Sequence, residues 1–264
     1  MEKNIHHLQS KINYSFTGNG EKILVLLHGF CEDLNVWNEF IVPLEKDIRI
    51  ICIDLPGFGK SLPGTEHTTL EHIADAIEAV LISEQIEKCF MVGHSMGGYV
   101  ALAFAEKYSD RLCGIGLFHS SCFQDDDQKK QNRKKVAEFV LSNGSKVFAH
   151  ELFPTLFTNE FAANNKLLIQ SLEDRAAVFP ASAIANGSLA MGNRKDKTSF
   201  LSTTSLPILM IIGKHDLAIP FEKSLMMSHL PASAQICLLQ HSAHMGMFEE
   251  PEKSKQAVLN FVLS

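Results

Sequence analysis

The sequence predicts an α/β fold in which a mostly parallel, twisted sheet is flanked by helices and interrupted by one inserted helical segment. Three observations predict it. Short apolar runs recur along the 264 residues, amphipathic helical patterns lie between most of these runs, and one long stretch contains no such run. Continuous apolar runs are typical of strands buried on both faces of a parallel sheet, and their alternation with helices indicates a doubly wound sheet.

The first expected strand differs from the later ones. Residues 12–16 alternate between apolar and polar side chains, and turn-forming residues follow at 17–20. This pattern predicts an antiparallel strand at the edge of the sheet. The later strands are expected where the apolar runs lie, at residues 23–27, 48–53, 90–92, 112–118, 207–212 and 236–239.

Helices are expected between these strands. After Thr69, apolar side chains recur at helical spacing from Ile73 to Leu81. Further helical patterns cover residues 97–108, 220–230 and 251–263, and the last of them begins with a proline, which suits the first turn of a helix.

One segment breaks the alternation. Residues 121–205 contain no buried-strand run, and this stretch is too long for an ordinary connection between two core strands. We therefore expect a helical cap at residues 121–205, inserted into a core that residues 1–120 and 206–264 form together. Within the cap, helical patterns occur at residues 136–141, 147–156 and 167–172.

Composition excludes several classes of protein. The formal net charge of −6 provides no basic field for nucleic acid, and no apolar run approaches the length that crosses a bilayer. The N-terminus lacks an apolar signal segment, and the six cysteines do not form a disulfide framework. We therefore expect a cytoplasmic protein without nucleic-acid or membrane partners, of unknown oligomeric state. The acidic residues 125–127 followed by the basic run 129–135 predict a solvated helix, with anion binding as the alternative.

The strongest local motif is the Gly-x-Ser-x-Gly pattern at residues 93–97. An apolar run precedes it and a helical pattern follows it, which is the strand–turn–helix context that a nucleophilic serine requires. Gly93 and Gly97 leave room for the strand and the helix to approach each other. The turn places Ser95 at a helix N-terminus, whose free N–H groups favour developing negative charge.

Further polar residues follow other apolar runs. His28 ends the run 23–27, Asp216 follows the run 207–212, and His244 follows the run 236–239. Open α/β sheets bind their ligands at the carboxyl ends of the strands, so these side chains are expected at one edge. A serine activated by a histidine base, which a carboxylate orients, is the arrangement that nucleophilic catalysis requires.

Together with residues 54–61 and 248–251, these motifs make the whole chain resemble the α/β-hydrolase family, in the branch with a helical cap. The chain order Ser95, Asp216, His244 is also the family's order. The resemblance implies the α/β-hydrolase fold, with Ser95 as nucleophile, His244 as base and Asp216 as its partner. It also implies that the backbone N–H groups of Phe30 and Met96 form the oxyanion hole.

Other histidines offer alternatives for the base. His28 and His94 flank the serine motif and in similar proteins shape the site. His215 adjoins Asp216 and is expected to point away, and His241 lies three residues before His244. His244 is favoured because an apolar-acidic-proline segment follows it.

The acidic residue is less ambiguous. After the run 112–118 no carboxylate occurs until Asp125, which favours Asp216. Asp33 and Asp54 are expected to serve turns or helix caps. Residues 57–61 resemble the end of a phosphate-binding loop, but Asp54 stands where its first glycine belongs. With no dinucleotide motif and no metal-ligand pattern, we expect no cofactor and no metal.

The substrate pocket is expected between the core and the cap. His28, Gly29 and His94 are its candidates in the core. The segment around Met191 resembles the cap of lactonase- and esterase-like family members, and an apolar roof suits an acyl or alkyl group. The cap candidates are Phe123, Leu156 and Met191.

These observations predict a serine hydrolase that cleaves carboxylic esters or lactones through an acyl-enzyme intermediate. The same triad also supports C–C bond hydrolysis, lyase chemistry or perhydrolysis. A small-molecule receptor that binds without turnover is the alternative outside catalysis. Epoxide hydrolases and haloalkane dehalogenases are disfavoured because they need an aspartate where this chain has Ser95.

Overall fold

The computed structural model describes residues 1–8, 10–63 and 68–264. Its strands form one eight-stranded sheet in the order β1-β2-β4-β3-β5-β6-β7-β8. The pairs β1/β2 and β2/β4 are antiparallel, and all the others are parallel. The strands are β1 (Glu2–His7), β2 (Ser10–Thr17), β3 (Ile23–Leu27), β4 (Arg49–Ile53), β5 (Cys89–His94), β6 (Leu112–Phe118), β7 (Ile208–Gly213) and β8 (Ala234–Leu239).

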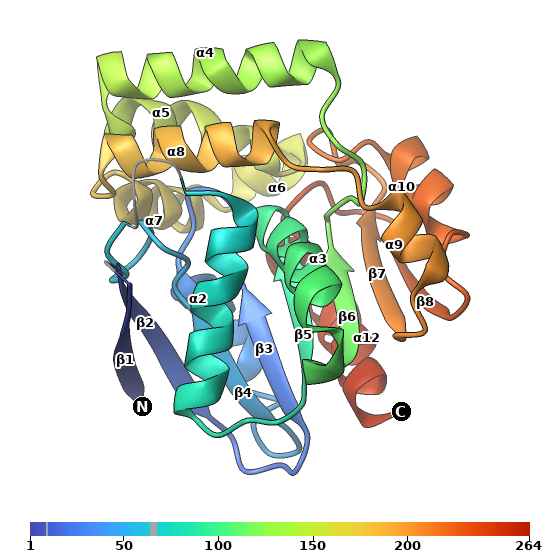
Figure 1. Ribbon diagram of the computed structural model, residues 1–264. Helices are drawn as coiled ribbons and strands as arrows, with labels where there is room; N and C mark the ends of the chain where they lie inside the picture. The colour runs from blue at the N-terminus through green and yellow to red at the C-terminus, as the bar shows by residue number, and fades with distance from the viewer. Residues whose placement is uncertain (9, 64–67) are drawn as a thin grey trace.

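Helices cover both faces of this sheet. In Figure 1, α2 and α3 pack on the face turned toward the viewer, and α12 lies behind the sheet. The core helices are α1 (Asn38–Ile41), α2 (Leu70–Ser83), α3 (Met96–Tyr108), α10 (Phe221–Ser228), α11 (Gly246–Glu249) and α12 (Pro251–Leu263), with 3-10 turns η1 (Leu34–Trp37) and η2 (Ser109–Arg111).

The central strands explain why the apolar runs are continuous. Every residue of β5 and β7 is buried, because helices cover both faces of the sheet. The predicted α/β class with a mostly parallel sheet is thereby confirmed. Two edge elements differ from expectation. The strand β1 was not expected, because its side chains are only partly buried or exposed, and β8 begins with three exposed residues because it has one neighbouring strand.

The segment between β6 and β7 consists of helices joined by loops and contains no strand among its residues, all of which the structure describes; we call residues 121–205 the cap. Its long helices α4 and α8 pack against each other across the top of the molecule in Figure 1. The cap helices are α4 (Asp127–Asn143), α5 (Ser145–Leu152), α6 (Asn159–Asn164), α7 (Lys166–Ala176), α8 (Ala181–Gly192) and α9 (Thr198–Thr203), with the 3-10 turn η3 (Phe153–Leu156).

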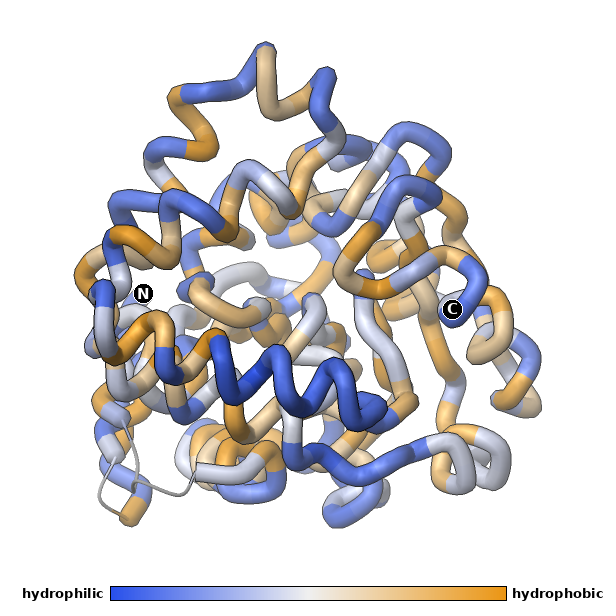
Figure 2. Tube along the Cα trace, turned by 90° about the horizontal axis from the view of Figure 1, so that it is seen from above, coloured by the Kyte–Doolittle hydropathy of each residue, from blue (hydrophilic) through white to orange (hydrophobic). Residues whose placement is uncertain are grey.

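The acidic and basic run lies at the start of the cap. Asp126 caps α4, since its carboxylate accepts the N–H of Lys129 at 2.8 Å. Figure 2 shows the first half of this helix as a continuous hydrophilic stretch on the outer side of the cap. Within the described residues, no helix is long and apolar enough to cross a membrane.

Candidate active site

Ser95 occupies the turn between β5 and α3 in a strained backbone conformation. Its φ and ψ angles are 50° and −113°, which L residues other than glycine rarely adopt. The turn is held by the N–H of Ser95, which donates to the carbonyl of Phe118 at 2.9 Å. A Cβ atom on Gly93 would lie 2.2 Å from the backbone of Gly97, so strand and helix approach this closely only with glycine there.

His244 and Asp216 form a buried hydrogen-bonded pair. His244 Nδ1 donates to Asp216 Oδ2 at 2.8 Å, and both residues are 4% exposed. The other carboxylate oxygen of Asp216 accepts the backbone N–H groups of Ala218 and Ile219 at 2.9 and 2.8 Å. The carboxylate is therefore fixed from both sides, and it fixes the plane of the His244 ring.

A third side chain in this cluster, His119, was not expected. It follows β6, and its Nδ1 donates to the same Asp216 Oδ2 atom at 3.1 Å. Its Nε2 accepts the N–H of Gly246 at 3.1 Å, which assigns the ring proton to Nδ1. The signal in the sequence is its place at the carboxyl end of a strand, where polar site residues of an open α/β sheet gather.

Burial and hydrogen bonding set the charges of this cluster. Burial lowers the pKa of His119 to about 4 despite its contact with Asp216, so the ring is neutral at pH 7. Burial alone raises the pKa of Asp216, but the adjacent His244 and His119 rings outweigh this effect and hold it well below its usual value. Asp216 is therefore a charged carboxylate over the whole physiological range.

The same three residues bring potential metal-ligand atoms within 4.8 Å of one another. However, the Nδ1 atoms of His119 and His244 both donate to Asp216 Oδ2. Nitrogens that carry these protons have no lone pair for a metal ion, so the arrangement is that of a hydrogen-bonded triad of side chains.

Glu32 and His94 form a second buried pair next to Ser95. His94 Nδ1 lies 3.1 Å from Glu32 Oε2, and His94 Nε2 lies 2.8 Å from the carbonyl of His244. Both partners accept hydrogen bonds, so both ring nitrogens donate and the ring is an imidazolium. Burial lowers the pKa of His94, but the Glu32 carboxylate, the His244 carbonyl and Asp216 together raise it above its usual value. Burial raises the pKa of Glu32, but His94, the Gly29 N–H and His28 together lower it below its usual value.

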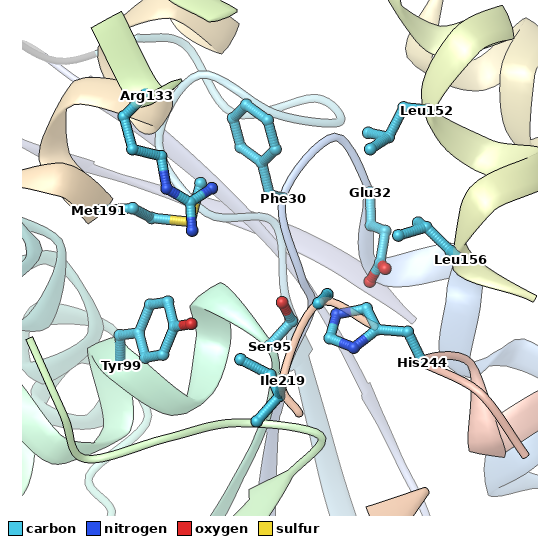
Figure 3. Close-up of a pocket in the computed structure, with 11 residues that line it drawn as sticks. Phe30, Glu32, Ser95, Tyr99, Arg133, Leu152, Leu156, Met191, Ile219 and His244 are labelled. Atoms are coloured by element: carbon cyan, nitrogen blue, oxygen red, sulfur yellow. The ribbon is translucent and has the colours of Figure 1, made fainter. Parts of the chain in front are cut away.

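Ser95, His244 and Glu32 line a cavity of about 90 Å³ between the core and the cap. Figure 3 shows Ser95 and His244 side by side at its floor, with Arg133 and Met191 on one side and Glu32, Leu152 and Leu156 on the other. In the described structure no hydrogen bond joins Ser95 Oγ to His244, which is common before a substrate binds. The cavity is lined by Phe30, Glu32, Ser95, Tyr99, Arg133, Leu152, Leu156, Met191, Ala218, Ile219 and His244.

Two backbone donors lie close to the serine. Met96 is the first residue of α3, and Phe30 lines the same cavity as Ser95. Within the described residues, neither the Phe30 nor the Met96 N–H donates to a protein acceptor.

Several expected pocket residues lie elsewhere. Leu156 and Met191 do line the cavity, but His28, Gly29, His94 and Phe123 are not among its lining residues. His28 is fully buried, with Nδ1 donating to Gly29 O and Nε2 accepting the N–H of Leu55. The rings of His28 and His94 are both hydrogen-bonded to backbone groups, those of Gly29 and Leu55 for His28 and that of His244 for His94. Phe123 instead offers its carbonyl to Arg194.

The alternative acids and the two alternative histidines after β7 and β8 do not line the cavity that contains Ser95. Asp54 accepts hydrogen bonds from Asn13 and from the backbone of Leu34 and Lys60, and Asp33 caps η1. The backbone N–H groups of His215 and His241 take part in the loops around the site, and both residues are exposed. The sequence did not identify Glu32, Tyr99 or Arg133 as cavity residues, because neither periodicity nor motif spacing distinguishes them.

Comparison with known proteins agrees with this geometry. Residues 22–251 match the family model described as alpha/beta hydrolase fold. A thermophilic esterase from Thermogutta terrifontis, solved with malate bound, superposes with a TM-score of 0.92 at 30% identity, over 100% of this chain and 98% of that one.

Two curated relatives align over nearly the whole chain. A pimeloyl-[acyl-carrier protein] methyl ester esterase from Yersinia enterocolitica is 28% identical over 95% of this chain and 97% of its own length. A dihydrolipoyllysine-residue acetyltransferase component of an acetoin cleaving system from Pseudomonas putida is 30% identical over 94% of this chain, which spans 65% of that longer protein. The chain therefore belongs to the alpha/beta hydrolase fold family and is a hydrolase.

Proposed function

We propose that the chain is a serine hydrolase of carboxylic esters or lactones, with Ser95, His244 and Asp216 as its catalytic residues. The observation that carries the proposal is the arrangement of Ser95. It stands on a strained turn, in the same cavity as a histidine whose far nitrogen is fixed by a buried carboxylate. The esterase relatives support the ester as the substrate class.

The reaction begins at Ser95 Oγ. His244 Nε2 takes the hydroxyl proton as Oγ attacks the acyl carbon, and Asp216 stabilises the imidazolium that forms. The carbonyl oxygen becomes an oxyanion, which the Phe30 and Met96 N–H groups receive; each such donor contributes about 3–4 kcal/mol to the transition state.

The tetrahedral intermediate then collapses. His244 returns the proton to the leaving alcohol oxygen, and the acyl group stays on Ser95. A water molecule, deprotonated by the same imidazole, attacks the acyl-enzyme and releases the acid. In a lactone the leaving oxygen remains tethered to the acyl group, so the product is a single hydroxy acid.

The first prediction tests the nucleophile. Ser95→Ala is expected to lower kcat for p-nitrophenyl butyrate by at least about 10³-fold, because no other group can form the acyl-enzyme. A fluorophosphonate should label Ser95 in the wild type, as peptide mass spectrometry will show. Ser199→Ala, which removes an exposed hydroxyl in the cap, is the matched control and should retain full activity.

Two results would contradict the proposal. Turnover by Ser95→Ala at the wild-type rate would remove the serine from the mechanism. A wild type that is labelled once by the ester but never turns over would identify a receptor instead of an enzyme.

A further inference from the structure

We propose that this enzyme selects substrates that carry a carboxylate at the end of the acyl chain, and that Arg133 of the cap binds it. The inference deepens the proposed ester hydrolysis and rests on it. The cavity is lined both by Arg133, which carries a guanidinium group, and by the nucleophile Ser95. In Figure 3 the guanidinium of Arg133 points from α4 into the cavity.

Arg133 is held in place by its neighbours. Its Nε donates to Asp125 Oδ2 at 3.1 Å, and its carbonyl accepts the Ser188 hydroxyl at 2.9 Å, which ties this turn of α4 to α8. A Cβ on Gly192 would lie 3.2 Å from the Cβ and Cγ atoms of Arg133, so α8 has a glycine where the arginine stem crosses it. The side chain therefore enters the cavity in a fixed orientation.

The outer end of the guanidinium is unused. In the described structure the Nη1 and Nη2 groups of Arg133 donate no hydrogen bond, although Nε does. Arg194 provides the contrast. It donates to the carbonyls of Phe123 and Met191, pairs with Asp125 at 2.8 Å, and lies 4.1 Å from the centre of the Tyr99 ring. The donors of Arg194 are occupied by protein groups, and those at the end of Arg133 are left for a ligand.

Arg133 and Arg194 both pair with the Asp125 carboxylate. Arg194 also lies near the Asp196 carboxylate, so Arg133 is the arginine of this pair whose outer donors have no described carboxylate partner. Lys129 lies on the same helix, and burial followed by the nearby charge of Lys223 lowers its pKa, as expected where cations crowd together. The remaining edge of the planar guanidinium, formed by Nη1 and Nη2, matches a carboxylate in a bidentate geometry.

The opposite end of the cavity fixes the direction of the substrate. Glu32 lines that end, and its negative charge is compensated by the His94 imidazolium at 3.1 Å. Glu32 presents only acceptor oxygens to the cavity, so a substrate carboxylate finds no hydrogen-bond donor from it, whereas Arg133 offers donors and a positive charge. Tyr99 adds a hydroxyl that makes no described protein hydrogen bond and points toward the cavity in Figure 3. The acid end of the acyl chain therefore binds at Arg133 and Tyr99, and its ester end lies at Ser95.

The test compares two methyl esters with the same six-carbon acyl chain. Monomethyl adipate carries the terminal carboxylate, and methyl hexanoate has a methyl group in its place. In the wild type we expect kcat/KM, measured in a pH-stat, to be on the order of tenfold or more higher for monomethyl adipate. Arg133→Gln should abolish this ratio, mainly through KM, and Tyr99→Phe should reduce it.

A matched control separates contact from general electrostatics. Lys134→Gln removes the same charge from the same helix at an exposed position and should leave the ratio of the two kcat/KM values unchanged. A wild-type ratio near one, or a ratio that Arg133→Gln leaves unchanged, would overturn the carboxylate site while ester hydrolysis stands. If neither ester is hydrolysed, the proposed function fails. Calorimetric binding of monomethyl adipate to wild type and to Arg133→Gln then decides the carboxylate site alone, and equal affinities would overturn it.

Discussion

The buried pair of Glu32 and His94 supports the active site from behind. Glu32 Oε2 accepts the N–H of Gly29 at 2.7 Å, in the loop that continues to Phe30. His94 donates to the carbonyl of His244, so the ion pair connects the loop of the expected oxyanion hole with the loop of the expected base. Breaking a buried pair by removing one partner is costly, because the other charge remains in a low-dielectric environment.

A pH prediction follows from this pair. The pKa of His94 is raised in the folded state, so its stabilisation is complete below about pH 6.5 and is lost as the pH rises through the folded value. The pKa of Glu32 is lowered, so its contribution is complete above about pH 4.5 and is lost as the pH falls through the folded value. Full stabilisation by the pair is expected between about pH 4.5 and 6.5.

Glu32→Gln should therefore lower the free energy of unfolding most in this window, and the difference from wild type should shrink toward pH 9. Urea unfolding of both proteins at several pH values measures this difference in the free energy of unfolding. Glu252→Gln, whose side chain is 87% exposed, is the control and should show no such profile. A difference that is constant from pH 5 to 9 would show that His94 does not titrate with the pair.

For single residues, the sequence could place Ser95, Asp216 and His244 at the carboxyl edge of the sheet, because each follows a recognisable strand and stands in a recognisable motif. It could not find His119 and Glu32 as their neighbours. The pairing of His119 with Asp216 joins residues 97 positions apart, and that of His94 with Glu32 joins residues 62 apart. Such contacts depend on the order of strands in the sheet, which a single sequence does not state.

The junction of β5 and α3 is the element on which the site depends. The strand delivers Ser95 to the carboxyl edge of the sheet, and the helix begins at Met96. Gly97 lies close to the end of β3, since a Cβ on this glycine would lie 2.5 Å from the carbonyl oxygen of Leu27. The two glycines of the motif predict this close approach of strand and helix from the sequence alone.

We expect Gly93→Ala to deform this junction. The added methyl group would meet the backbone of Gly97 at 2.2 Å, and backbone atoms cannot move aside as a flexible side chain can. The free energy of unfolding should fall by about 1–3 kcal/mol, as is typical of overpacking, and kcat should fall as Ser95 shifts. Circular dichroism melts and ester hydrolysis measure the two effects.

Gly144→Ala is the matched control for this prediction. Gly144 has a positive φ angle, 86°, which Gly93 does not, but a Cβ on Gly144 would meet nothing within 4 Å, and the residue lies in the cap between α4 and α5. Gly144→Ala should cost about 1–3 kcal/mol of backbone strain and leave kcat unchanged. Equal kcat values for the two variants would mean that the close approach at Gly93 has no part in placing Ser95.

At the scale of the whole molecule, the cap and the core meet at the loop that carries His244. The N–H of His244 donates to the carbonyl of Leu156 in η3 at 2.9 Å, and the rings of Phe157 and Phe248 lie 6.3 Å apart. The run of helices between β6 and β7 was predictable, because this stretch breaks the alternation of strands and helices. The sequence does not show which side chains of the cap face inward, because α4 is mostly polar and Arg133 stands within a run of basic residues.

Glu249 is the side chain that ties these parts together. One carboxylate oxygen accepts the N–H of Thr158 in the cap at 2.8 Å. The other accepts the N–H of Ala243 at 2.8 Å and the hydroxyl of Ser242 at 3.1 Å, both beside His244. A single carboxylate therefore positions the loop of the expected base and anchors the cap above it.

Glu249→Ala is expected to lower kcat by about tenfold or more with a smaller change in KM, because His244 loses its alignment while the cavity walls remain. The free energy of unfolding should fall by about 1.5–3 kcal/mol for each hydrogen bond to the charged group that is lost. Glu249→Gln keeps an oxygen acceptor and should recover part of kcat, and Glu252→Ala, at an exposed position of α12, should match the wild type. Loss of stability with an unchanged kcat would reduce Glu249 to a structural anchor of the cap, without influence on the base.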